Sequence, residues 1–489
     1  MKKIILYCIL LLTIFFNSGC KKFLDVNNDP NDPADVSEPL LLAPIETTMA
    51  TTLTAGSWTV GNYGTLTVIE DYWTQQLALN QIQPQFDTYK VRPDDIDQMF
   101  LTIYSSILNN SKILNEKAET NGNYSYAVIS KILTAYTLGE TTDAWGDLPY
   151  SQAFNGNLHA SYDSQETIYT DIQSLLDSAI SENETLPAGE LTPGADDFIY
   201  NGNMSKWEKF AYTLKARYYM HLTKAPGHTA SAQATLALAA LQHGFASNAD
   251  EANFSAYSNS AGSESPWNEN INAGQGGVVM ASTFVNNLIA KNDPRLPIMC
   301  STDSFQYADD GTITSDTLGT YVGRVIGSAP AADFTVAYST VNNFYSAPQA
   351  PLSIVSYSEA LFLQAEATLI TSGSAAANPS YTAGIISNMK KLGVDTTLMN
   401  TYVANNGTLD PVPSNALQMI IDEKFVANFL SSENFTDWRR TGFPTLSIIS
   451  NPFVPTMPRR FPYPLAELNL NQQPQQSAVI TDRVWWDTP

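Results

Sequence analysis

The chain has 489 residues, of which 44 % are hydrophobic and 11 % aromatic, and its formal net charge is −23. The length and apolar content allow a large globular core. The acidic surface argues against nucleic-acid binding, because phosphate contacts need clustered lysine and arginine, and it also disfavours attraction to anionic lipid.

The first twenty residues predict a lipoprotein signal. Lys2 and Lys3 precede an apolar run over residues 4–16, which is long enough for a signal-peptide core and too short to span a bilayer. Asn17-Ser18-Gly19-Cys20 resembles a bacterial lipobox, although such motifs usually carry Leu at the place of Asn17. We expect residues 1–19 to be removed and Cys20 to be acylated, which anchors the protein to a membrane. The alternative is an ordinary secretory signal whose cleavage site happens to contain cysteine.

Residues 20–36 predict a flexible tether, since they are rich in Asn, Asp and Pro and too polar to form a core. Asp25, Asn27 and Asp29 resemble the start of a calcium loop, but Gly is missing at its sixth position and Glu at its twelfth. We therefore expect no metal and no other cofactor. Residues 37–489 are expected to form a single domain.

Cysteine usage agrees with a lipid anchor. Cys8 leaves with the signal and Cys20 takes the lipid, so Cys300 alone remains in the mature chain and an intramolecular disulfide is excluded. Cys300 follows an apolar stretch and is expected to be a small buried residue.

Helical signals recur in pairs joined by short polar turns. Apolar residues at helical spacing, with polar caps and glycine or proline stops, predict the helices. They lie at 94–117, 124–138, after a cap at Ser164, after a capping box at 205–208, and at 230–241, 356–369, 381–391 and 414–430. The pairing suggests stacked helix–turn–helix units, although no fixed-period repeat is present.

An irregular lobe is predicted over about residues 243–355. Residues 253–277 are dense in Ser, Asn and Gly, 309–311 form a turn signal, and 321–327 read as extended. Within this stretch only 278–290 reads as a helix. Loops of this length are usually functional or disordered.

Several longer motifs follow one another along the chain. They are CKKFLDVNNDPNDP from residue 20, WGDLPYSQAF at 145–154, KWEKFAYTLKARYYMHL at 206–222, NDPRLP at 292–297, SEALFLQAEA at 358–367, IIDEKFVANFLSSENFTDWRRTGFP at 420–444, MPRRFPYPLAELNLN at 457–471 and VWWD at 484–487. Together and in this order they resemble the SusD/RagB family of surface lipoproteins of Bacteroidetes, particularly its nutrient-binding subgroup.

The resemblance implies an all-α superhelix of tetratricopeptide-like helix pairs with an irregular lobe. It also implies a lipid-anchored position on the cell surface, at the outer membrane. The implied partner is a SusC-like TonB-dependent transporter, over which such a lipoprotein acts as a lid. The usual cargo in the family is a glycan (oligosaccharide), sometimes a peptide.

The motifs themselves read mostly as scaffold. Trp145 is expected to pack, and Asp147 to cap a helix. Asp437, Arg439 and Arg440 predict an ion-pair network, with Glu359 and Glu366 on one helix face as anchors for these arginines. The two glutamates also resemble a glycosidase pair, which needs carboxylates roughly 5–9.5 Å apart across a bound sugar.

Enzyme signatures are missing from the sequence. It has no H-E-x-x-H, G-x-S-x-G, P-loop or paired C-x-x-C, and its four histidines lack metal-ligand spacing. We therefore expect a binding protein rather than an enzyme. The alternatives are a peptide-binding lid of the same kind of transporter, a lipid-anchored glycan hydrolase, and a purely structural lid.

The ligand-binding residues are inferred from sugar chemistry. A sugar presents apolar C–H faces and hydroxyl rims, so a receptor needs exposed aromatic planes beside polar side chains. Two regions meet this requirement, one near residues 58–73 and one in the Ser/Asn/Gly-rich loop. The predicted contacts are Trp58, Tyr63 and Tyr72 in the first region, and Tyr257, Trp267 and Asn268 in the second.

Overall fold

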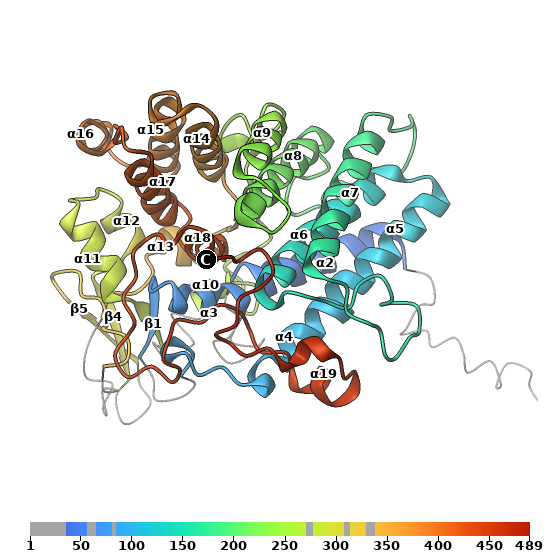
Figure 1. The fold of residues 1–489 in the computed structure, drawn as a ribbon, viewed down its shortest axis with the longest axis horizontal. Coiled ribbons are helices and arrows are strands. Elements are labelled where there is room, and N and C mark those ends of the chain that lie inside the picture. Colours follow the sequence, from blue (N-terminus) through green and yellow to red (C-terminus); the bar gives the residue numbers. More distant parts are fainter. Residues whose placement is uncertain (1–35, 56–64, 81–84, 270–276, 308–312, 329–337) are drawn as a thin grey trace, which may run out of the picture.

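Helices dominate the computed structural model, which describes residues 36–55, 65–80, 85–269, 277–307, 313–328 and 338–489 (Figure 1). The N-terminal part contains α2 (Glu38–Leu53), α3 (Leu66–Trp73), α4 (Asp97–Thr102), a π-helical turn at Ile103–Leu108, α5 (Asn109–Asn121), α6 (Tyr124–Trp145), α7 (Gln165–Asn183), α8 (Met204–His221) and α9 (Ala230–Leu241). The C-terminal part contains α14 (Tyr357–Ser372), α15 (Ser374–Lys391), α16 (Thr396–Asn406), α17 (Pro413–Ala427), α18 (Glu433–Thr441) and α19 (Leu465–Leu470).

Most of the long helices pack against a neighbour in sequence. α5 contacts α6, α6 contacts α7, α8 contacts α9, and α14 contacts α15. The pairs also contact one another, since α14 packs against both α9 and α17, and the helices form an arc over α3 and α18 (Figure 1). The all-α prediction is confirmed.

Polar caps set several of the helix starts. The Ser164 hydroxyl accepts a hydrogen bond from the Thr167 amide (3.2 Å) at the start of α7, and the Ser356 hydroxyl accepts from the Glu359 amide (3.1 Å) at the start of α14. The predicted capping box at 205–208 is wrong by two residues. Asn203 caps α8 instead, and its side-chain oxygen accepts from the Lys206 amide (3.2 Å).

Short 3-10 turns lie at Phe86–Thr88, Pro93–Ile96, Leu222–Lys224, Asn248–Asp250 and Pro474–Ser477.

The lobe between the two groups of helices contains α10 (Pro266–Asn268), α11 (Ser282–Ala290), α12 (Leu296–Met299) and α13 (Asn343–Ser346). The structure confirms that the lobe is less regular than the rest of the chain. The turn predicted at 309–311 lies outside the described residues.

Three antiparallel strand pairs tie the lobe together. β1 (Leu77–Leu79) pairs with β3 (Val278–Met280), β2 (Ala252–Phe254) with β6 (Leu352–Val355), and β4 (Asp303–Tyr307) with β5 (Ile313–Thr317). The helix predicted at 278–290 is therefore wrong in its first turn. Residues 278–280 are β-branched or flexible apolar residues that hydrogen-bond to a strand about 200 positions earlier, and α11 begins only at Ser282.

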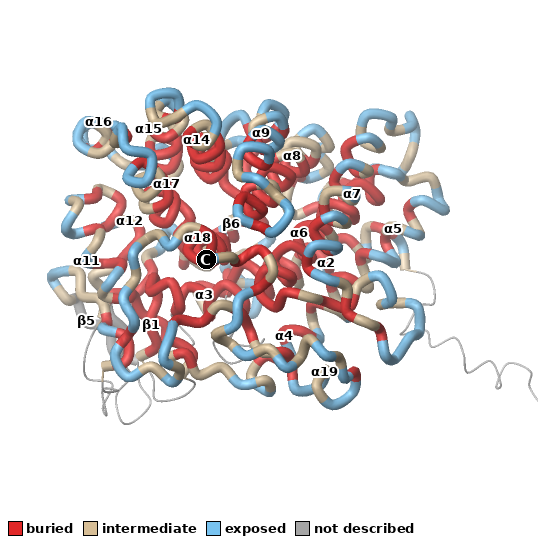
Figure 2. The backbone as a smooth tube through the Cα atoms, viewed as in Figure 1, coloured by how far each residue is buried: buried red, intermediate tan, exposed pale blue. Residues whose placement is uncertain are grey.

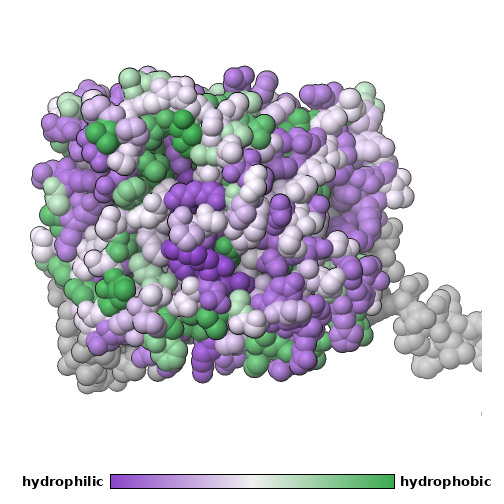
Figure 3. Space-filling model, viewed as in Figure 1, coloured by the Kyte–Doolittle hydropathy of each residue, from purple (hydrophilic) through white to green (hydrophobic). Residues whose placement is uncertain are grey.

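The main core runs through the whole fold, with two satellite clusters between α8, α9, α14, α15 and α17. Figure 2 shows that the buried segments lie on the inner sides of the helices and along α3 and α18. Cys300 is buried, as predicted, and burial raises the pKa of its thiol. Within the described ranges, the helices are too short or too polar to cross a membrane. On the face shown in Figure 3, apolar residues are scattered among hydrophilic ones.

Candidate functional site

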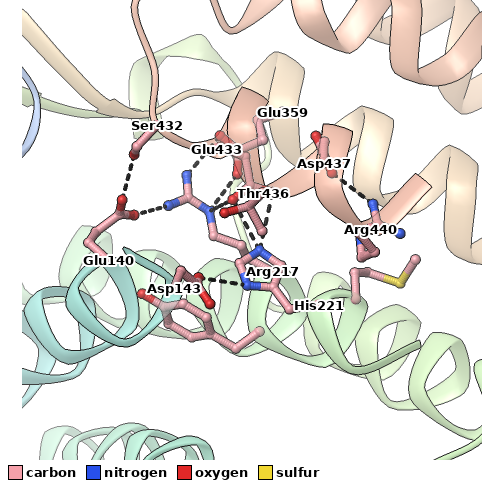
Figure 4. Close-up of polar contacts among 12 residues, drawn as sticks. Glu140, Asp143, Arg217, His221, Glu359, Ser432, Glu433, Thr436, Asp437 and Arg440 are labelled. Atoms are coloured by element: carbon pink, nitrogen blue, oxygen red, sulfur yellow. Dashed lines mark hydrogen bonds and ion pairs between the residues drawn. The ribbon is translucent and has the colours of Figure 1, made fainter. Parts of the chain in front are cut away.

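Charged side chains from five helices meet inside the protein in what we call the buried ion-pair network (Figure 4). Arginine, lysine and histidine alternate with carboxylates there, and every member is almost completely withdrawn from solvent. The members are Glu140 and Asp143 of α6, Arg217 and His221 of α8, Glu359 and Glu366 of α14, Lys424 of α17, and Glu433, Asp437 and Arg440 of α18.

Arg217 joins α6, α8 and α14. Its Nε and Nη2 donate to the two carboxylate oxygens of Glu359 at 2.7 and 2.8 Å, and its Nη1 donates to Glu140 at 3.1 Å. The guanidinium is 1 % exposed. A two-pronged pair of this kind is geometrically specific, and it costs much stability to break because the carboxylates would stay buried without their cation.

His221 lies one helical turn further along α8, between two carboxylates. Its Nδ1 is 3.1 Å from Asp143, and its Nε2 is 3.1 Å from Glu433. Burial by itself would lower the pKa of His221, but the charges of Glu433 and Asp143 outweigh burial and raise the pKa to about 9. The imidazole is therefore a cation at neutral pH, with both ring nitrogens donating. A protonated ring held in this way is not a metal ligand.

The predicted pairing around Arg440 is confirmed. Arg440 makes a two-pronged contact with Glu366 and contacts Asp437 at 2.7 Å, while Lys424 bridges Asp437 and Glu433 at 2.8 Å each. Glu359 was expected to anchor one of the two adjacent arginines of α18. It pairs instead with Arg217 of α8.

Arg439 has a different environment from its neighbour. Its guanidinium lies 4.2 Å from the centre of the Phe435 ring and 4.7 Å from that of Trp486, and it donates to the backbone oxygen of Asp143 at 2.5 Å. The Trp486 indole in turn donates to the Asp143 carboxylate at 2.7 Å. Trp486 of the VWWD motif therefore packs against α6 and α18 and covers this end of the buried ion-pair network.

Trp145 and Asp147 of the WGDLPY motif are scaffold, as predicted. Trp145 is buried and its indole donates to the backbone oxygen of Pro462 at 2.9 Å. Asp147 accepts from the amide of Gln165, the first residue of α7, at 2.9 Å. The NDPRLP motif is also structural, since Arg295 is fully buried against Asp293 and Glu423 at 2.6 and 2.7 Å.

This arrangement stabilises the fold and leaves no room for a substrate. Glu359 and Glu366, the pair that resembles glycosidase carboxylates, are 1 % and 2 % exposed and are bound to Arg217 and Arg440. Within the parts of the chain that the structure describes, no group of three or more His, Cys, Asp or Glu side chains is placed to hold a metal ion.

Two of the predicted ligand contacts are buried in the core. Trp267 is 2 % exposed and Tyr72 is 0 % exposed. The expectation that these rings are displayed to solvent is corrected, because Pro266 and Trp267 form a buried helical turn within the lobe, and Tyr72 lies on α3, which is buried along its length. Neither ring offers a face to a sugar in this conformation.

The other predicted contacts differ in their surroundings. Tyr257 is half-buried, and its ring packs 5.2 Å from that of Phe254. Asn268 is also partly exposed, and its amide donates to the backbone oxygen of Ser346 at 2.9 Å. Trp58 and Tyr63 lie outside the described residues.

Sequence reasoning missed a concave site on the other side of the molecule from the lobe. A cavity of about 340 Å³ opens between α5, α6, α7 and the loop at residues 150–154. Its one sequence signal is the end of the WGDLPYSQAF motif, where Tyr150 and Phe154 occur in a polar loop. Aromatic residues in such a loop can equally well anchor the loop to the core or contact a ligand.

Stacked helix pairs around a buried ionic interior define a helical-repeat scaffold. Over residues 30–464 the chain matches the SusD-like family profile that is described as "Starch-binding associating with outer membrane". The chain belongs to this SusD-like family. A comparison with curated protein sequences gave no match.

Solved structures share the fold. A SusD homologue from Bacteroides uniformis is 21 % identical, with a TM-score of 0.76 over 92 % of this chain and 99 % of that one. A SusD/RagB family protein from Bacteroides thetaiotaomicron is 23 % identical, with a TM-score of 0.71 over 93 % and 99 %. A chitin-binding SusD homologue from Flavobacterium johnsoniae is 21 % identical, with a TM-score of 0.74 over 91 % and 98 %.

Proposed function

We propose that this protein captures oligosaccharides at the cell surface and delivers them to a TonB-dependent outer-membrane transporter. The observation that carries the proposal is the family match over residues 30–464, to a family described as starch-binding and associated with the outer membrane. A structural relative described as chitin-binding supports a glycan as the cargo.

The anchor in this proposal is an acyl group on Cys20. The lipobox-like residues before Cys20 and the polar spacer after it support a tethered position on the outer membrane. Both lie in the first 35 residues, outside the described part of the chain. The SusC-like partner, over which the protein would act as a lid, is inferred from the family resemblance.

Binding rather than catalysis is proposed because the carboxylates that resemble a glycosidase pair are buried and paired with Arg217 and Arg440. A glycosidase needs one carboxylate free to exchange a proton with the substrate. On the lobe, Tyr257 and Asn268 keep partly exposed side chains and remain our proposed contacts there.

Calorimetry with maltotriose, chitotriose and a mixed peptide pool tests this function, combined with analysis of each sugar after incubation. We expect heat of binding with at least one sugar and no shortened product. Cleavage of a sugar would identify a hydrolase, and binding of peptides alone would identify a peptide-binding lid. No binding to any of these would favour a lid that only seals the transporter.

A further inference from the structure

The cavity between α5, α6, α7 and the loop at residues 150–154 is separate from the lobe. Its volume, about 340 Å³, falls in the range of small-ligand sites. Twelve residues line it, and no residue so far assigned to ligand binding is among them. They include Ser111, Lys112, Asn115, Lys131, Tyr150, Ala153 and Phe154.

One wall of the cavity is aromatic. Phe154 stacks on Tyr104 with the ring centres 6.0 Å apart, and Tyr104 stacks on Phe100 with the ring centres 4.5 Å apart. The partly exposed ring of Phe154 is therefore held in place by the two rings packed behind it. Phe154 has a φ of 59°, in the left-handed region that an aromatic residue rarely adopts. Backbone strain of this kind concentrates at ligand-binding sites.

The loop that carries this wall is held in place. The Asp163 carboxylate accepts hydrogen bonds from the Tyr150 amide at 3.1 Å, the Ser151 amide at 2.6 Å and the Ser151 hydroxyl at 2.7 Å. A site formed before the ligand arrives avoids the entropy cost of ordering the loop on binding.

The opposite wall contains two buried oxygens that lack a hydrogen-bond partner among the described residues. They are the Ser111 hydroxyl and the Asn115 side-chain oxygen. Ser111 is completely buried. Buried polar atoms in folded proteins nearly always have a partner. A turn of each side chain toward the cavity would bring its oxygen within reach of a ligand hydroxyl, and a ligand that carries hydroxyl groups would then satisfy both.

The charges around the cavity favour an uncharged ligand. Lys112 is paired with Glu116 at 2.6 Å, and Lys131 with Glu119 at 2.8 Å and Glu182 at 2.7 Å. Both cations that line the cavity are therefore already neutralised. No acidic side chain lies among the described residues that line it.

We propose that this cavity binds one or two rings of an uncharged sugar. The rings stack on Phe154 and Tyr150, and their hydroxyls bond to Ser111 and Asn115. An acyl chain would leave both oxygens unpaired, and an anion would find both lysines occupied. This inference rests on the proposed function, in that it takes the cargo to be a glycan, and it gives that cargo a second site away from the lobe.

The test uses maltose and N,N′-diacetylchitobiose as probes in calorimetry with the purified protein. Ser111→Ala should weaken binding about three- to tenfold, the range of one lost hydrogen bond. Its melting temperature should stay the same or rise, because the removed hydroxyl has no partner in the described structure and alanine favours helix. Ala153→Phe, which fills the cavity, should weaken binding at least tenfold.

The matched control is Ser105→Ala, an exposed serine on the same helical run, which should bind like the wild type. Hydrogen exchange locates the site independently, since a bound sugar should slow exchange of the amides at residues 150–154. If the wild type binds neither sugar, the proposed function fails together with this inference. If the wild type binds while Ser111→Ala and Ala153→Phe are unaffected and exchange at 150–154 is unchanged, only the inference is overturned.

Discussion

Arg217→Met is the sharpest test of the buried ion-pair network. The change removes the cation that pairs with Glu359 and Glu140 but keeps most of the side-chain volume. Removing one partner of a buried pair costs about 3–5 kcal/mol of unfolding free energy. With about 2.1 cal/mol/K of melting entropy per residue over the roughly 420 described residues, this loss lowers the melting temperature by about 3–6 °C.

The contribution of the pair to stability is measured by calorimetric melts of four proteins: wild type, Arg217→Met, Glu359→Gln and the double variant. The double variant should be more stable than the sum of the single losses predicts, by at least about 1 kcal/mol, because both members of the Arg217–Glu359 pair are then gone and only Glu140 still lacks its cation. Lys112→Met serves as the control, since its pair with Glu116 is 42 % and 60 % exposed, and its melting temperature should not change measurably. A loss below about 1 kcal/mol for Arg217→Met would refute the reasoning.

Three further predictions follow from other features. Cys20→Ala should move the protein from the membrane fraction to the soluble fraction, and unchanged fractionation would contradict acylation. His221 has a pKa of about 9 when folded against an ordinary value of 6.5, so its stabilisation is complete below pH 6.5 and is lost as the pH rises through 9. Urea unfolding from pH 6 to 10 should show this decline, and His221→Gln should flatten it. Trp267→Ala should lower the unfolding free energy by about 3–5 kcal/mol, as for a buried tryptophan, while the affinity of the folded protein for sugar is retained; weaker binding with an unchanged melt would return Trp267 to the binding site.

Local signals in the sequence were enough to place most long helices. The helix predicted at 230–241 has the bounds of α9, and the predicted cap Ser164 is the observed one. Ser356, predicted as the first residue of a helix, is the N-cap of α14. These features depend on neighbours a few residues away. The capping role expected of Asp147 is observed across a longer distance, since its carboxylate accepts from the Gln165 amide 18 positions later, beside the N-cap Ser164.

Features that depend on distant segments were not predictable in the same way. Residues 278–280 have the composition of a helix start as much as of a strand, and only pairing with Leu77–Leu79 decides between them. Trp267 has polar neighbours that suggested exposure, yet Ser265 donates to the backbone oxygen of Pro348, which holds the turn against the core. The cavity beside Phe154 depends on three helices and a loop meeting, and its local signal is limited to Tyr150 and Phe154 at the end of the WGDLPYSQAF motif.

The contacts of α6 have a consequence for how the chain reaches its folded state. Glu140 receives a hydrogen bond from Ser432, 292 positions later, and Asp143 receives one from Trp486, 343 positions later. Contacts between such distant positions form slowly, because a long loop must close before they give any stability. A chain made from its N-terminus can pair Glu140 with Arg217 and Asp143 with His221 as soon as α8 is present, but the contacts with Ser432 and Trp486 form only after those residues follow. Assembly of the interior is therefore completed only by a chain that carries its last motif.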